Sequence, residues 1–409
     1  MFGRVECPRE KGPSMEITHV QSSFVAPLGG AESYILALAT EQVRRGDDVE
    51  IVTGWTDPRT VERARRAGIR VRTVQVHRPY RPDQHGGGAV AKVVFHALDL
   101  MGAVTPAPLD LDVQEPGRIT HVHRFQGLGA QVLRARRSPV VHTAHDYCLV
   151  DTTSTTIRDG REPDGLGPVQ RLRARTIWSA ARRASILVFP SERTLARHRA
   201  LGMPNDGVAQ RVLPHGWPAP APVAPAAEGS ARPRFVFLGK LQAAKGVALL
   251  LEAWPLIGVD AELVVAGDGP ERPAVERAAA AGHLTYVGWL DGPAKAALIA
   301  SATALVFPSL WPETFGLVIA ESLLSGRPVV ATPQAAGSFV RDGENGLVTS
   351  GASPAALAET LRRLALDEAL RDRLARGAAD SALALDFGTH VDRIAEVYAD
   401  AREIFARRR

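Results

Sequence analysis

Short runs of apolar and β-branched residues alternate with stretches of helical periodicity along most of the chain. In the first half, the runs cover residues 17–20, 49–54, 69–76, 119–123, 139–145 and 186–191. After the first run, Ile35, Leu38, Ala39 and Val43 recur at helical spacing, from a GlyGly start to a stop at Gly46. Strand and helix in alternation predict a parallel sheet covered by helices on both faces.

The alternation stops near Pro214 and restarts near Arg234. Residues 214–233 are rich in proline and alanine and predict a semi-rigid linker. The second set of runs covers residues 234–240, 261–269, 283–290, 304–309 and 327–332. We therefore predict an α/β protein with two Rossmann-like domains, residues 15–213 and 234–385, after a leader at 1–14. Because such sheets bind ligands at the carboxyl ends of their strands, the crevice between the domains is the expected site.

Composition narrows the function classes. The 49 Lys and Arg against 44 Asp and Glu leave a formal charge of +5, the arginines are scattered, and aromatic residues make up only 6%. This pattern gives nucleic-acid binding little support. Two cysteines, Cys7 and Cys148, exclude a cysteine metal cluster and fit a reducing compartment. We find no signal-peptide core and no apolar run of ~20 residues, so we expect a cytoplasmic protein, with peripheral contact to the inner membrane face left open.

Lysine is scarce in this chain, which has only Lys11, Lys92, Lys240, Lys245 and Lys295. Two of them, Lys240 and Lys245, follow the first strand of the second domain in GKLQAAKG. Two cations at that spacing suit a diphosphate leaving group, which gains negative charge as its bond to a sugar breaks. The alternative is a pair of solvated lysines.

The most specific local pattern is FPSLWPETFGLVIAESLLSG. It predicts a strand, a loop carrying Glu313, and a helix from about Thr314 whose free N–H groups belong to Phe315, Gly316 and Leu317. Glu321 lies eight residues after Glu313, about 12 Å along a helix axis. Carboxylates so placed suit the two ends of an elongated ligand, with phosphates at the helix N-terminus between them. The alternative is a helix-capping Glu313 and a solvent-facing Glu321.

The first domain offers weaker candidates. Gly29 and Gly30 stand between the first strand and its helix, where bare N–H groups can receive a phosphate, or where a tight turn needs glycine for its dihedral angles. His145 and Asp146 end one strand and His123 ends another. Each histidine is either a ligand of sugar hydroxyls or a packed or surface residue. Spacing alone assigns Asp268, in AGDGPE, no chemistry.

In this order, the segments resemble the retaining glycosyltransferases of family four, which have the GT-B fold. The resemblance runs from about Met15 to the C-terminus. Its most specific part is the E-x7-E motif, Glu313 to Glu321 in PETFGLVIAE, followed by SGRPVVAT and DGENGLV. The family fold implies two domains facing each other across a cleft, and a C-terminal helix, 386–409, that crosses back to the first domain.

The resemblance also implies roles for single residues. The donor diphosphate would be bound by Gly29 and Gly30, neutralised by Lys240 and Lys245, and held by the N–H groups of Phe315, Gly316 and Leu317. Glu313 would contact the donor sugar, Glu321 the ribose, and His145 would be the cleft histidine. No metal and no cofactor is implied, because lysines and a helix dipole replace the divalent cation of other transferases.

The chain departs from the family pattern at two positions. Relatives usually carry Arg where this chain has Lys240, which replaces a bidentate fork by a point charge. Ser338 stands near the position of a loop Glu that relatives often have, which puts contacts from that loop in doubt.

We thus expect a metal-independent retaining hexosyltransferase that moves a sugar from a nucleotide diphosphate sugar, with UDP the expected nucleotide, to an acceptor hydroxyl. The rivals are a nucleotide-sugar epimerase or a phosphorylase of the same fold, and a non-catalytic sugar-binding protein. A nicotinamide dehydrogenase is disfavoured, since PLGGAES has no G-x-G-x-x-G. The sequence does not identify the base and sugar of the donor, the acceptor, the linkage or the oligomeric state.

Overall fold

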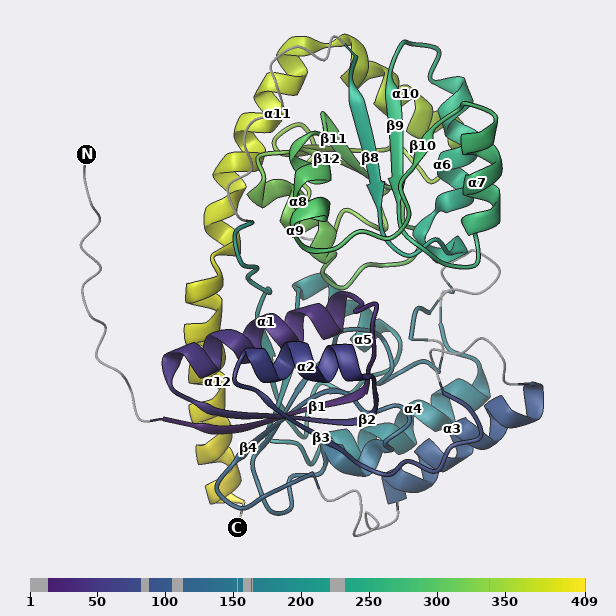
Figure 1. The fold of residues 1–409 in the computed structure, drawn as a ribbon. Coiled ribbons are helices and arrows are strands. Elements are labelled where there is room, and N and C mark those ends of the chain that lie inside the picture. The colour runs from purple at the N-terminus through teal and green to yellow at the C-terminus, as the bar shows by residue number, and fades with distance from the viewer. Residues whose placement is uncertain are drawn as a thin grey trace, which may run out of the picture.

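The protein is described by a computed structural model, which covers residues 14–81, 88–104, 113–152, 154–156, 163, 165–220, 232–337 and 339–408. The described residues form two parallel sheets, each with helices on both faces (Figure 1). The predicted α/β architecture with two Rossmann-like domains is confirmed. Most of the predicted leader lies outside the described residues, as do 221–231 of the predicted linker.

The first sheet has seven strands in the order β3-β2-β1-β4-β5-β6-β7. Its domain contains β1 (Glu16–Phe24), α1 (Gly30–Arg45), β2 (Asp48–Thr56), α2 (Pro58–Arg66), β3 (Arg70–Thr73), α3 (Ala89–Val104), β4 (Ile119–Arg124), β5 (Val140–Thr143), α4 (Pro168–Ala181), β6 (Ile186–Phe189), α5 (Glu192–Ala200) and β7 (Ala209–Val212).

The second sheet has six strands in the order β10-β9-β8-β11-β12-β13. This part contains β8 (Arg234–Leu238), α6 (Val247–Ala253), β9 (Glu262–Ala266), α7 (Arg272–Ala280), β10 (Thr285–Tyr286), α8 (Gly292–Ala300), β11 (Ala304–Phe307), α9 (Leu317–Leu324), β12 (Val329–Ala331), β13 (Gly346–Val348), α10 (Pro354–Leu366), α11 (Glu368–Ser381) and α12 (Phe387–Arg407).

Both sheets are buried on both faces, which explains why their strands read as continuous apolar runs. In β8, Phe235 and Phe237 pack into one core, while Val236 and Leu238 pack into the core on the opposite face. All eleven predicted runs contain a strand. Two short edge strands, β7 and β13, were not predicted, because β7 has the largely polar sequence AQRV and β13 is only three residues long.

The last helix, α12, lies on the first domain although the second domain precedes it in the chain (Figure 1). Its residues Ile394 and Tyr398 share a core with Ile17 of β1. The chain also crosses between the domains just before β8: Trp217 N–H donates to Leu385 O at 3.0 Å, and His390 donates to Pro214 O at 2.9 Å. Residues 214–217 are therefore packed against the start of α12 rather than forming a free spacer.

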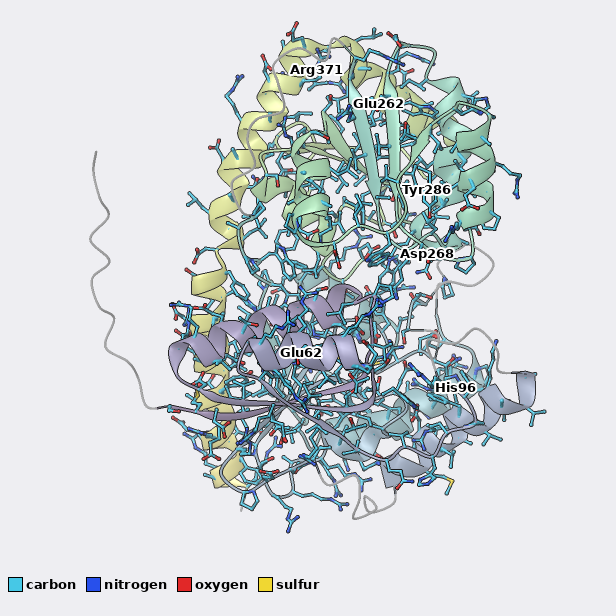
Figure 2. All side chains as sticks on the ribbon, viewed as in Figure 1. Glu62, His96, Glu262, Asp268, Tyr286 and Arg371 are labelled. Carbon is cyan, nitrogen blue, oxygen red and sulfur yellow. The ribbon has the colours of Figure 1, made fainter. Side chains whose placement is uncertain are left out.

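In each sheet, the candidate residues follow the carboxyl ends of strands next to the point where the strand order reverses. In the first sheet β1 neighbours β4, and in the second β8 neighbours β11, so chain connections leave in opposite directions at these two points. Such points are where open α/β sheets form ligand crevices. Asp268 follows β9 and lies at the end of the second sheet that faces the first domain, whereas Glu262 lies at the far end (Figure 2). No helix in the described part of the chain is long and apolar enough to cross a membrane.

Candidate active site

Glu313 lies in the loop that follows β11 and is buried, with 4% of its surface exposed. Its Oε1 accepts a hydrogen bond from Ser309 Oγ at 2.8 Å, another from the Trp311 indole, and forms an ion pair with Lys245. Glu313 does not cap a helix, because α9 begins at Leu317 with Gly316 as its N-cap residue. The capping alternative is therefore wrong for this residue.

The two predicted lysines have different surroundings. Lys245 ends a short 3-10 turn before α6, and its Nζ lies 4.8 Å from the centre of the Trp311 ring while it pairs with Glu313. Lys240 is exposed, and no carboxylate of the described residues forms an ion pair with it. The pair-of-solvated-lysines alternative is wrong for Lys245, while Lys240 presents a free ammonium group.

The glycine loop of the first domain faces this lysine. A β-carbon on Gly29 would lie 3.7 Å from Lys240 Nζ, and one on Gly30 would lie 3.5 Å from Leu317 Cδ1. Gly29 has a φ of −76°, and neither glycine is among those with positive φ. The turn does not need glycine for its dihedral angles, so that alternative is wrong. What glycine provides here is open backbone opposite the second domain.

Glu32 is a residue of this loop that sequence reasoning missed. Its Oε2 would lie 2.7 Å from a β-carbon on Gly29, and Gln21 Nε2 donates to its Oε1 at 2.8 Å. As an acid in the first turn of α1, Glu32 is stabilised by the helix dipole. The site therefore holds a carboxylate beside the expected phosphate position as well as the lysine.

The helix after Glu313 begins later than predicted. Its N-cap is Gly316, with a left-handed φ of 78°, rather than a residue near Thr314. The free N–H groups at its start therefore belong to Gly316, Leu317 and Val318, and within the described residues none of them has an acceptor. Phe315 precedes the helix, and its ring packs 4.8 Å from that of His215.

Glu321 is buried on α9, so the solvent-facing alternative is wrong. It forms an ion pair with Lys295 of α8, a lysine whose partner the residue pattern does not indicate. Its Oε2 is buried and has no donor at hydrogen-bond distance among the described residues, although the Trp217 indole approaches the carboxylate. Burial raises the pKa of Glu321, against the opposing effect of Lys295. An acceptor atom buried without a donor is available to a ligand hydroxyl.

His145 joins the two domains at the end of β5. Its backbone carbonyl accepts a hydrogen bond from Thr314 Oγ1, the neighbour of Glu313, at 2.7 Å. Its ring Nε2 lies 2.9 Å from Nδ1 of His123, which is itself buried, as the packed alternative for His123 expects. Burial lowers the pKa of His145 to about 3, with Asp146 opposing the shift. His145 is therefore neutral at neutral pH.

His215 was also missed. It follows β7, and its ring lies 5.1 Å from that of His145 and 4.1 Å from that of Tyr34. Both of its ring nitrogens are buried and have no hydrogen-bond partner in the part of the chain that the structure describes. The sequence signal for His215 is a histidine shortly after a strand, but the residue pattern does not predict β7 itself. Ser338 lies outside the described residues.

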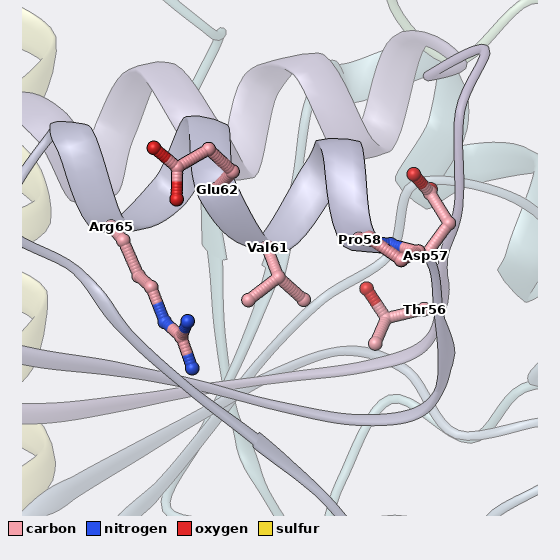
Figure 3. Close-up of a pocket in the computed structure, with 6 residues that line it drawn as sticks. All are labelled: Thr56, Asp57, Pro58, Val61, Glu62 and Arg65. Atoms are coloured by element: carbon pink, nitrogen blue, oxygen red, sulfur yellow. The ribbon is translucent and has the colours of Figure 1, made fainter.

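A surface hollow of about 550 Å³ lies away from these residues, along α2 (Figure 3). Asp57 at its rim caps α2 through the N–H groups of Arg59 and Thr60 and accepts a hydrogen bond from Ala26 N–H at 2.7 Å. These polar groups are already used by the fold. The strand ends between the two sheets remain the candidate site.

Comparisons with known proteins agree with this geometry. The model of the family described as Glycosyltransferase Family 4 matches residues 28–216, and that of Glycosyl transferases group 1 matches residues 232–367. The chain is similar to a D-inositol 3-phosphate glycosyltransferase of Actinosynnema mirum, with 30% identity over 96% of this chain and 97% of the relative. It is 28% identical to a phosphatidyl-myo-inositol mannosyltransferase of Mycobacterium leprae, over 92% of this chain and 94% of the relative.

Among solved structures, the fold resembles that of Anabaena HepE in complex with UDP, with a TM-score of 0.69 and 19% identity. This match covers 94% of the present chain and 99% of HepE.

Proposed function

The chain belongs to glycosyltransferase family 4 and is a retaining glycosyltransferase, and from this premise we propose that it moves a hexose from a UDP-sugar to an acceptor hydroxyl without a metal ion. The observation that carries the proposal is the position of Lys240 over Gly29, while the adjacent Gly30 faces the Leu317 side chain at the start of α9. A cation, open backbone and a helix N-terminus together form a site for a diphosphate.

The two lysines of the site suit an anionic leaving group, although Glu32 places a carboxylate beside the same position. As the bond between sugar and diphosphate breaks, negative charge grows on the phosphate oxygens. Lys240 has no ion-pair partner within the described residues, so its charge can act directly on the diphosphate. Lys245 adds a second cation, which is held beside Glu313. These groups supply the electrostatic stabilisation that a divalent cation supplies elsewhere. We propose on this basis that no metal is needed.

The two glutamates differ in what they offer a ligand. Glu313 is fixed by Ser309, Trp311 and Lys245, and in our proposal its carboxylate orients the donor sugar. Glu321 has a buried oxygen without a close donor, which suits a ribose hydroxyl. With the acceptor hydroxyl held on the face of the sugar from which the diphosphate leaves, the bond between the anomeric carbon and the phosphate oxygen breaks and the acceptor oxygen bonds to that carbon on the same face. The departing diphosphate takes the acceptor proton. No side chain then acts as general base.

The identity of the nucleotide and the acceptor rests on relatives. HepE was solved with UDP, which supports a uridine donor. The A. mirum and M. leprae relatives are named for D-inositol 3-phosphate and phosphatidyl-myo-inositol. We therefore place a cyclitol hydroxyl first among the acceptors to test. An epimerase, a phosphorylase and a binding protein have no comparable support.

We also propose peripheral contact with the anionic inner face of a membrane. Apolar residues Val90 and Val93 on α3 and Val169 and Leu172 on α4 are about 70–80% exposed. Lys92, Arg171 and Arg175 are exposed on the same two helices, whose one carboxylate, Asp99, is buried. Exposed apolar and basic side chains together suit an anionic lipid surface. Sedimentation with vesicles of anionic but not zwitterionic lipid, lost in Val93→Asp, tests this contact.

The transfer itself is tested with UDP-, GDP-, ADP- and TDP-sugars in the presence of a chelator. We expect one UDP-sugar to raise the melting temperature and to release UDP when the acceptor is supplied. The anomeric configuration of the product, read by proton NMR, should equal that of the donor. Preference for another base would overturn the UDP assignment, and dependence on a divalent cation would overturn the metal-free mechanism.

A further inference from the structure

One face of the first sheet carries a row of histidines behind His145. His19 on β1 stands beside His121 on β4, and His123 follows on the same face two residues later. Helices α1 and α12 cover this face and contribute Gln42 and Tyr398. All of these side chains are buried.

These side chains form a continuous chain of hydrogen bonds. From the cleft inward, His145 Nε2 contacts His123 Nδ1 at 2.9 Å, and His123 Nε2 contacts His19 Nδ1 at 2.9 Å. His19 Nε2 contacts Gln42 Oε1 at 2.7 Å, and Gln42 Nε2 contacts Tyr398 OH at 3.3 Å. The chain connects the cleft to the crossing-back helix.

A second branch completes the network. Tyr398 OH contacts His121 Nδ1 at 2.8 Å, and His121 Nε2 contacts Thr143 Oγ1 at 2.8 Å. Three of these histidines, His19, His121 and His123, lie close enough to hold a metal ion. Their nitrogens are, however, all used by the hydrogen bonds just described, so the hydrogen-bond network accounts for the cluster.

Each hydrogen bond in this chain has a defined donor and acceptor. An amide oxygen only accepts, so with Gln42 Oε1 on His19 the proton of His19 sits on Nε2 and its Nδ1 is an acceptor. His123 must then donate from Nε2, and His145 must also donate from Nε2. Neutral rings are required for this alternation, and burial lowers the pKa of His19 to about 4 and that of His145 to about 3.

We propose that Gln42 sets the tautomer of His145 through His19 and His123, so that His145 carries its proton on Nε2 and keeps Nδ1 as a hydrogen-bond acceptor. No described residue hydrogen-bonds to Nδ1. Gln42 is a positioning residue, since it acts only through other side chains.

The consequence for the reaction rests on the proposed function. Nδ1 is on the half of the ring nearer the backbone, and the carbonyl of His145 is bound to Thr314 beside Glu313. His145 then accepts a hydrogen bond from a sugar hydroxyl and cannot donate from Nδ1 to a phosphate. The lysines and helix N–H groups then bind the diphosphate, and His145 binds the sugar hydroxyls.

The tautomers can be read directly from the protein without turnover. Nitrogen-15 NMR of the full chain with labelled histidine distinguishes protonated from unprotonated ring nitrogens, and His145→Gln assigns the signal. We expect the proton on Nε2 in His145, His123 and His19 at neutral pH. A proton on Nδ1 of His145 in the wild-type protein overturns the proposal, whatever the enzyme transfers.

Replacing Gln42 tests its control of the chain. In Gln42→Met the acceptor for His19 is lost, and because a buried N–H without a partner is rarer than a buried lone pair, His19 should move its proton to Nδ1. His123 and His145 then change to the opposite tautomer in turn, so His145 becomes protonated on Nδ1. We expect kcat to fall on the order of tenfold, as for one lost hydrogen bond. Gln210→Met, a change distant from the network, should alter neither readout.

Unchanged tautomers in folded Gln42→Met would overturn the role of Gln42. If this variant does not fold, the wild-type spectrum still decides the tautomer. Absent transfer activity with the expected tautomers would count against the proposed function alone.

Discussion

Lys240 Nζ of the second domain lies 3.7 Å from the point where a β-carbon on Gly29 of the first domain would sit. This arrangement brings a cation that has no ion pair within the described residues, at the end of β8, against bare backbone after β1. The two residues are more than two hundred positions apart in the sequence, and each follows the strand at the switch point of its sheet. A diphosphate placed between them would meet both at once.

Lys240→Ala should remove donor binding with little effect on folding. Because the side chain is exposed and has no ion pair in the described structure, we expect the free energy of unfolding to change by less than about 0.5 kcal/mol. Loss of the cation should lower kcat/KM for the donor about a hundredfold. Lys240→Arg should retain most activity, since the charge remains. Arg277→Ala, on the exposed face of α7, is the control and should leave kcat/KM unchanged. Equal activity in all three variants would show that Lys240 does not meet the donor.

Gly29→Ala should weaken donor binding while the protein stays folded. The added carbon would approach Glu32 Oε2, the movable end of a side chain, so the cost to stability should stay below about 1 kcal/mol. The same carbon would occupy space in front of Lys240, and we expect the Kd for UDP to rise about tenfold, measured by calorimetry. Gly351→Ala has nothing within 4 Å and should leave the Kd unchanged. Wild-type affinity in Gly29→Ala would exclude the glycine loop from the phosphate site.

Lys245→Met should lower both stability and activity. Lys245 is 18% exposed and pairs with Glu313, which would be left buried with only Ser309 and Trp311 as donors. We expect a loss of about 2 kcal/mol in the free energy of unfolding, measured in urea, together with loss of transfer. Double-mutant analysis with Glu313→Gln should show coupling of the two changes. Additive effects on stability would contradict the ion pair.

The buried histidines should make the protein acid-sensitive. The pKa values of His19 and His142 are lowered to about 4 by burial, whereas an unfolded histidine titrates near 6.5. Between these values the unfolded state binds more protons, so stability should fall as the pH drops from about 6.5 towards about 4 and should not change above that window. At about pH 5, each such histidine costs on the order of 2 kcal/mol.

Urea unfolding at a series of pH values measures this slope. His142→Asn keeps a donor for Val122 O and removes one titrating group, so the slope should shrink. His283→Gln replaces an exposed histidine and should leave it unchanged. A flat stability profile between about pH 6.5 and about pH 4.5 would contradict the burial of neutral rings.

The sequence predicted most of the fold because its strands are buried on both faces and read as uninterrupted apolar runs. It also singled out Lys240, Lys245, Glu313 and Glu321 as candidate site residues, since scarce lysines and spaced carboxylates stood out. It misplaced the start of α9, because Gly316 in a left-handed conformation delays the helix in a way that the residue pattern does not indicate.

What the sequence could not predict are the partners of the charged groups. Lys295 meets Glu321 only because α8 packs beside α9, and Tyr398 joins the histidine row only because α12 returns to the first sheet. Such contacts depend on how separate elements pack, and no local pattern encodes them. The same holds for His215, which acquires its neighbours from both domains.

The most direct test of the account is transfer by Glu313→Gln in the presence of a chelator. The variant keeps an acceptor for Ser309 and Trp311 but loses the charge, and Glu276→Gln, on the exposed surface of α7, is the matched control. We predict that wild type and Glu276→Gln transfer sugar without a metal ion, while Glu313→Gln is slower by at least about a hundredfold and is still stabilised by UDP. Wild-type rates in Glu313→Gln, or wild-type transfer that stops when divalent cations are removed, would contradict the mechanism.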